Sequence, residues 1–145
     1  GSTGPPGPAG SSSTSTNGTD TESGGASLTG TLTNIGSGVP LAVVGTYLVT
    51  ATFSFSANAS AIGGDTGTCR LRDDTSGSSF TQTHKFCGTD SAGGVGLNVD
   101  SMASIVGIVK TTGVNHQVYL QAAYAAIGMG TCTIDKLDMT YVKLG

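Results

Sequence analysis

The segment Thr46–Ala57 reads TYLVTATFSFSA, and its apolar and hydroxyl side chains alternate almost without a break. Every second residue from Tyr47 to Ala57 is apolar or aromatic, and the residues between them are Leu48 and a series of Thr and Ser. Successive side chains of a β-strand point to opposite faces. This segment is therefore predicted to be a strand with an aromatic-rich face toward the core and a Thr/Ser face on the other side.

The rest of the sequence repeats this short-range pattern between turns rich in Gly, Asn and Asp, such as Gly63-Gly64-Asp65 and Gly128-Met129-Gly130. We expect six further strands, at Ser27–Thr33, Thr68–Asp73, Ser79–Cys87, Ser101–Thr111, His116–Ala126 and Thr131–Leu144. Seven or eight strands at this spacing predict an all-β fold, either a sandwich or a jelly roll.

The composition of the 145-residue, 14.2 kDa chain excludes several classes of protein. Only 10% of the residues are charged, which disfavours a helical bundle, while 37% are hydrophobic, which disfavours a disordered chain. The net charge is −3 with six basic residues, so we expect no nucleic-acid binding. The longest apolar stretch, Val39–Val49, contains Pro40 and Gly45, so we expect no insertion into a membrane.

The first ten residues, GSTGPPGPAG, carry glycine at positions 1, 4, 7 and 10 with prolines between them. Glycine at every third position with intervening proline is what a collagen triple helix requires. We interpret residues 1–10 as the end of a collagen-like stalk, although a Gly/Pro-rich linker is the alternative. Residues 11–27, rich in Ser, Thr and Gly, are predicted to form a neck, and residues 28–145 a single head domain.

The order of these segments resembles a known superfamily. Gly45-Thr46-Tyr47-Leu48-Val49, then Ile105–Lys110, a turn and Gln117–Ala122, and a last strand from Ile134 to Leu144 resemble the globular heads of complement-type and tumour-necrosis-factor-like (TNF-like) proteins. Heads of bacterial spore-surface collagen-like proteins and phage fibres are similar. One departure is Val114-Asn115-His116, where many members have Gly-Asp. The resemblance implies a TNF-like jelly-roll β-sandwich that forms a homotrimer.

A homotrimer would explain why the late strands are apolar on both faces in places. Our candidates for the trimer interface are Tyr124, Leu137, Met139, Tyr141, Val142 and Leu144. An outer sheet with two apolar faces would bury one of them against a neighbouring subunit. The alternative is that these residues belong to the core of a monomer.

Three cysteines, Cys69, Cys87 and Cys132, form no C-x-x-C pair. If residues 68–87 form a hairpin about Ser78, Cys69 faces Cys87, and a disulfide between them is our first candidate. A bulge would change this register, since the same hairpin sets Leu71 opposite Lys85. A Cys69–Cys132 bond and three free thiols are the alternatives. Any disulfide would agree with an extracellular location.

Neither metal chemistry nor catalysis has a complete set of residues. His84-x-x-Cys87 has the spacing of zinc ligands but supplies only half a site, and Asp73-Asp74 is more typical of a solvated turn than of a calcium loop. There is no Gly-x-Ser-x-Gly or phosphate-binding loop. Asp135 and Asp138 would point to opposite faces of a strand. We therefore expect no metal, no cofactor and no enzymatic activity.

The function that these expectations favour is that of a trimeric fibre head on a cell, spore or virion surface. The head would trimerise the stalk and attach to a receptor or glycan through its loops. The residues near loops that we consider candidate ligand contacts are Asp65, Arg70, Arg72, Asp73, Asp74 and Phe80. Few aromatic or Arg anchors lie there, so a purely structural capping or decoration protein of a spore coat or phage particle is the alternative.

Overall fold

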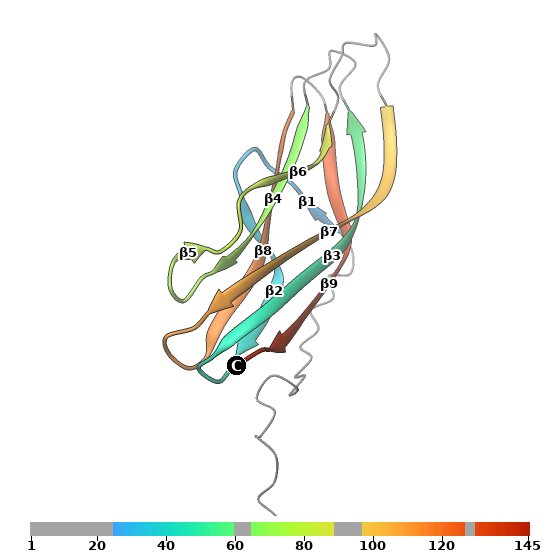
Figure 1. Cartoon of the computed structure of the whole chain (residues 1–145). Coiled ribbons are helices and arrows are strands. Elements are labelled where there is room, and N and C mark those ends of the chain that lie inside the picture. Colours follow the sequence, from blue (N-terminus) through green and yellow to red (C-terminus); the bar gives the residue numbers. More distant parts are fainter. Residues whose placement is uncertain (1–24, 60–64, 89–96, 127–129) are drawn as a thin grey trace, which may run out of the picture.

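A computed structural model describes residues 25–59, 65–88, 97–126 and 130–145. The predicted collagen-like segment 1–10 and all but the last residues of the predicted neck lie outside this range. Within it, the regular elements are β-strands arranged in two antiparallel sheets, which form a β-sandwich (Figure 1). This part of the chain contains no helix that is long and apolar enough to cross a membrane. The all-β prediction is confirmed.

The first sheet has the strand order β1-β9-β3-β7. Its long strands are β3 (Thr46–Ala59), β7 (Leu97–Lys110) and β9 (Thr131–Lys143), and β1 (Ala26–Ser27) adds a short edge beside β9. β3 lies at the centre and pairs along nearly its whole length with β7 on one side and β9 on the other. The strand predicted for Thr46–Ala57 is thus confirmed, with two more residues at its end.

The second sheet has the order β2-β8-β4-β5, with β6 also paired to β4. It consists of β2 (Thr33–Leu41), β8 (His116–Ala125), β4 (Thr66–Asp73), β5 (Ser78–Ser79) and β6 (His84–Gly88). β8 pairs with β2 and β4 and is the central strand of this layer. The two sheets bring together strands that are far apart in the chain, as Figure 1 shows.

The beginning of the domain differs from the prediction, because the strand expected at Ser27–Thr33 does not form. In its place β1 ends at Ser27 and β2 begins at Thr33. β2 contains two glycines in the left-handed region, Gly36 (φ 72°) and Gly38 (φ 73°), at an irregularity in its pairing with β8. Glycine adopts this conformation without a steric penalty. Because of this bulge, the side chains of β2 do not follow a regular period-two pattern, and the sequence does not predict the strand. Pro40 is exposed, and it is tolerated because β2 is an edge strand.

The strand expected at Ser79–Cys87 is divided into β5 and β6, and the hairpin register is not centred on Ser78. Arg72 pairs with Ser79, but after a shift in register Cys69 lies opposite His84 and Gly67 lies opposite Cys87. The predicted register, with Cys69 facing Cys87, is therefore wrong. The cause is the position of the turn, which is centred between Thr75 and Ser76 because Asp73 pairs with Ser78. A further irregularity, between Gly67 and Thr68, shifts the pairing beyond Cys69.

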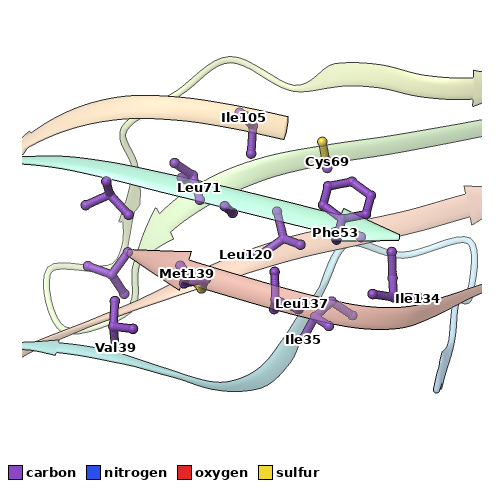
Figure 2. Close-up of a cluster of buried hydrophobic side chains, with 14 of the residues drawn as sticks. Ile35, Val39, Phe53, Cys69, Leu71, Ile105, Leu120, Ile134, Leu137 and Met139 are labelled. Atoms are coloured by element: carbon purple, nitrogen blue, oxygen red, sulfur yellow. The ribbon is translucent and has the colours of Figure 1, made fainter. Parts of the chain in front are cut away.

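The core lies between the two sheets and is almost entirely aliphatic and aromatic. Phe53 from β3 and Leu137 from β9 face Leu71 from β4 and Leu120 from β8, each at most 1% exposed. Figure 2 shows these side chains within the cluster between the strands. Phe86 of β6 packs edge-on against Phe53, with ring centroids 5.1 Å apart, at the edge of the core. The sandwich thus buries the inward face of each long strand.

Candidate functional site: the outer faces of the two sheets

The outer face of the first sheet carries exposed apolar side chains along β7. Met102, Val106 and Ile108 are 68%, 57% and 58% exposed. They alternate along the strand with Ile105 and Val109, which are buried in the core. We refer to Met102, Val106 and Ile108 as the β7 stripe. Large apolar side chains grouped on one face, rather than scattered singly, are typical of an interaction surface.

From Ile108, the last residue of the β7 stripe, a row of apolar side chains extends across the sheet to β3 and β9. Ile108 lies opposite Leu48 of β3, and Leu48 lies opposite Val142 of β9. Leu48 and Val142 are half-buried. Side chains in register on adjacent strands lie about 5 Å apart. The three residues therefore form an apolar row across three strands of the outer face.

The inner face of β7 is covered by the segment that follows β5. A Cβ added at Gly107 would lie 2.5 Å from the Thr81 Cγ2 atom and 3.0 Å from the Phe80 ring, so only glycine fits there. Phe80 is half-buried and packs against the core. Part of the Phe80 ring is therefore used for packing inside the chain, and its contact with a ligand stays a prediction.

The outer face of the second sheet, by contrast, is polar. Gln121 of β8 donates a 2.8 Å hydrogen bond from Nε2 to Asn34 Oδ1 of β2 and accepts one of 2.8 Å from Arg70 Nε of β4. The bonds run across three neighbouring strands, where Arg70 is in register with Gln121 and Gln121 with Asn34. The amide group of Gln121 thereby fixes the positions of the side chains on either side of it.

A second group of polar bonds adjoins the first. Arg72 Nε lies 3.2 Å from Asp74 Oδ1, and Asn34 Nδ2 donates a 3.4 Å hydrogen bond to Asp74 Oδ2. The side chains of Arg72 and Asp74 are 27% and 43% exposed, and Tyr119 is in register with Arg72. We call Asn34, Arg70, Arg72, Asp74 and Gln121 the polar network. Three of its members were predicted ligand contacts, whereas Asn34 and Gln121 were not identified from the sequence.

Asp73, another predicted ligand contact, is only 2% exposed and has a different role. Its Oδ2 lies 2.6 Å from Nδ1 of buried His116, and its Oδ1 accepts hydrogen bonds from the backbone N–H groups of Thr75 and Ser76. These bonds hold the turn between β4 and β5. The expectation for Asp73 is therefore corrected: its carboxylate supports the turn and does not face a ligand.

Asp65 is likewise corrected, because it is 0% exposed. The Tyr124 hydroxyl donates a 3.1 Å hydrogen bond to Asp65 Oδ2. Burial first, and then this bond to the Asp65 carboxylate, raise the pKa of Tyr124 above its ordinary value. The pair is an internal polar contact beneath the surface.

The predicted trimer-interface residues are mostly core residues of one chain. Tyr124, Leu137, Met139 and Tyr141 are at most 8% exposed within the isolated chain. The expectation is corrected for these four, since Tyr124 on β8 and the other three on β9 face the core between the two sheets. Val142 is half-buried and Leu144 is exposed, so both are compatible with an interface.

The β7 stripe was missed, although the sequence contains a signal for it. Val106 and Ile108 fall between Ile105 and Val109, so the strand is apolar in both phases of the period-two pattern. In a strand of which one face meets the core, the other phase is then an exposed apolar face. The alternation in this segment predicts both the strand and an apolar face that is left outside the core.

Cys69, Cys87 and Cys132 are free thiols in this structure, and the predicted Cys69–Cys87 disulfide is not formed. Within the described ranges, no group of three or more Cys, His, Asp and Glu side chains is arranged to hold a metal ion.

No protein-family model and no curated protein matches the chain. Among solved structures, the chain is similar to the dimeric latent PorU from Porphyromonas gingivalis, with 16% sequence identity and a TM-score of 0.40. The similarity covers 88% of this chain but 13% of that one, so the chain spans a small part of the structure it matches. A likeness at this level carries no argument about function.

Proposed function

We propose that this chain is the non-enzymatic head of a homotrimeric, collagen-like fibre on a cell, spore or virion surface. In this proposal the head trimerises the stalk and attaches the fibre to a receptor or glycan. The observation that carries it is the contrast between the two outer faces of the sandwich. One bears the β7 stripe and the other the polar network.

The occupant that we propose for the β7 stripe is the same face of two further copies of the chain. Three side chains there are more than half exposed, and removing each from water would stabilise an assembly by about 1 kcal/mol or more. The glycines at positions 1, 4, 7 and 10 give the number of copies, because a collagen triple helix contains three chains.

The strand order supports the jelly-roll form of the sandwich. When β5 and β6 are counted as one strand, the first sheet has the order 1-8-3-6 and the second 2-7-4-5. A double-sheet jelly roll consists of eight strands in two Greek keys. This order agrees with the resemblance to TNF-like heads, in which the sandwich is the unit that trimerises.

The test of the proposal is the solution mass, measured by light scattering after size exclusion. We expect a mass near 43 kDa, three times 14.2 kDa, for the full chain. A version that begins at Gly25, the first described residue, is expected to remain trimeric. A mass of one chain for both proteins would contradict the trimeric head.

A pair of variants tests the face. Ile108→Asp introduces a charge into the β7 stripe and is expected to give monomers at concentrations where the unchanged chain is a trimer. Val114→Asp is the matched control, because Val114 is 62% exposed but lies in the turn after β7. If both variants stay trimeric, the interface lies on another surface.

Attachment is the second part of the proposal and is favoured by the polar network. Gln121 is only 7% exposed and serves to position its neighbours. The guanidinium groups of Arg70 and Arg72 and the exposed amide of Asn34, held by hydrogen bonds within the polar network, can bind the hydroxyl groups of a sugar. We expect Arg70→Ala with Arg72→Ala to abolish binding on a glycan array, whereas Lys136→Ala on the other sheet leaves binding unchanged. A trimer that binds no glycan and no host cell would favour the purely structural capping role.

A further inference from the structure

Two of the three thiols meet across the sandwich, although they belong to different sheets. Cys87 is on β6, which pairs with β4 in the second sheet, and Cys132 is on β9 in the first sheet. Their side chains are hydrogen-bonded to each other. Because 44 residues separate them in the sequence and no strand pairing joins β6 to β9, this contact is made by the packing of the sheets alone.

The backbone around Cys87 leaves room for its sulfur. Gly67 lies opposite Cys87, and a Cβ added at Gly67 would be 2.5 Å from Cys87 Sγ. The Gly67 backbone also donates a hydrogen bond to the Cys87 side chain. On the other sheet, Cys132 lies opposite Ala57 and is 2% exposed, so its side chain points inward. Each thiol is thus directed toward the space between the layers.

We propose that Cys87 and Cys132 form a disulfide that links the two sheets, and that Cys69 remains a free thiol. Cys69 is buried on β4 and faces His84 in the strand register, not Cys87. The inference does not depend on the trimeric assembly, because both sulfurs belong to one chain. In this proposal Cys69 is the unpaired cysteine, and a Cys87–Cys132 bond takes the place of the Cys69–Cys87 bond expected from a simple hairpin.

The two thiols differ in exposure, which gives the reaction an order. The hydrogen bond from Cys132 is the main cause that lowers the pKa of Cys87, and the same contact, together with burial, raises the pKa of Cys132. Burial raises the pKa of Cys69 to about 11, which keeps that thiol protonated near neutral pH. Cys87 is also the least buried of the three, so it is the thiol that attacks first.

The oxidant that we specify is a low-molecular-weight disulfide, such as oxidised glutathione. The Cys87 thiolate attacks one of its sulfurs, forms a mixed disulfide and releases one thiolate. Cys132 then loses its proton and attacks Cys87 Sγ, which forms the bond between the sheets and releases the second thiolate. The two protons from the protein thiols go to the two leaving thiolates. In sum, two protein thiols are oxidised and one small disulfide is reduced to two thiols.

The experiment treats the full chain with oxidised glutathione, unfolds it in denaturant, counts free thiols by mass tagging and identifies linked peptides by mass spectrometry. We expect one free thiol, at Cys69, and a link between the peptides that contain Cys87 and Cys132. The bond should raise Tm by on the order of 10 °C, because it closes a long loop in the unfolded chain. Reduction should reverse the shift.

Matched variants separate the possible pairings. Cys69→Ser is expected to form the same link and to retain no free thiol, whereas Cys87→Ser and Cys132→Ser are expected to form no link within the chain. Three free thiols after oxidation, a link that contains Cys69 or a link between two chains would each overturn the proposal. Because the peptide map is made on the unchanged chain, the result does not depend on whether a variant folds.

Discussion

At the scale of single residues, Asp73 and Asp74 show how neighbours in sequence can differ completely in role. Asp73 is buried and bonded to His116 and to the turn, whereas Asp74 is exposed and bonded to Arg72. The alternation of the strand end places one carboxylate inside the sandwich and the next outside. A buried carboxylate is tolerated only when its oxygens accept hydrogen bonds. The partners of Asp73, which are His116 and the turn N–H groups, are therefore needed for the stability of the fold.

Replacing Asp73 should therefore be far more costly than replacing Asp74. We expect Asp73→Ala to lower the free energy of unfolding by about 3 kcal/mol, because it leaves buried His116 and two turn N–H groups without their acceptor. Asp74→Ala, the control, is expected to change it by less than about 1 kcal/mol. Urea denaturation measures both, and equal losses would show that the Asp73 pair has no structural role.

A second prediction at this scale concerns the Cys69 thiol under reducing conditions. Burial, followed by the neighbouring Cys87, raises its pKa from 9.0 to about 11. A group whose pKa is raised by folding contributes stability fully below its unfolded pKa and loses it as the pH rises toward the folded one. The free energy of unfolding should thus fall between pH 9 and pH 11. Cys69→Ala should show a shallower fall in urea titrations, and an unchanged slope would contradict the assignment.

At the scale of elements, β3 is the strand on which the first sheet depends. It pairs with β7 and β9 and sends its aromatic side chains into the core, while its Thr and Ser side chains face outward. β2 is the opposite case, since its two left-handed glycines interrupt the regular pattern. Regular alternation of apolar and polar residues therefore predicts the central strand β3, but it does not predict the bulged edge strand β2.

The central position of β3 leads to a test with neighbouring residues. Phe53→Ala removes a side chain that is 1% exposed and is expected to lower the free energy of unfolding by about 3 kcal/mol or more, through lost burial and a cavity. Thr52→Ala, one residue earlier on the outer face, should cost less than about 1 kcal/mol. Chemical denaturation of both variants measures the difference. A loss under about 1 kcal/mol for Phe53→Ala would mean that the strand is turned the other way.

At the scale of the whole molecule, the sandwich has one apolar and one polar outer face. The β7 stripe and the polar network lie on opposite layers. A head arranged in this way could assemble through one layer and present the other. In the function that we propose, assembly and binding would use separate faces, so a variant on one face would leave the other intact.

Trimerisation has a thermodynamic signature that does not require a mass measurement. Because association stabilises only the folded state, Tm should rise by several degrees when the chain concentration is increased a hundredfold. Ile108→Asp should remove most of this concentration dependence, whereas Val114→Asp should retain it. Differential scanning calorimetry at several concentrations measures the effect. A Tm that is independent of concentration in the unchanged chain would contradict assembly.

The sequence by itself determined the all-β class, the position of the long strands and, in β3, which side chains face the core. These properties are local, because alternation along one strand is enough to set its two faces. The bounds of β3, β4, β7, β8 and β9 agree with the predicted segments to within four residues at each end. The apolar positions of Leu137, Met139 and Tyr141 were correctly placed on one face, although that face is the core.

The tertiary structure alone decided how distant strands meet. The position of the turn and the register of β4 against β6 place Cys69 opposite His84 and not opposite Cys87, and the period-two pattern does not record them. The contact between Cys87 and Cys132 depends on the packing of two sheets. The polar network likewise depends on the register of β2, β8 and β4. The period-two alternation of the sequence determines which face of the sheet a side chain lies on. Its neighbours on other strands are determined by the long-range pairing of strands and the packing of the two sheets.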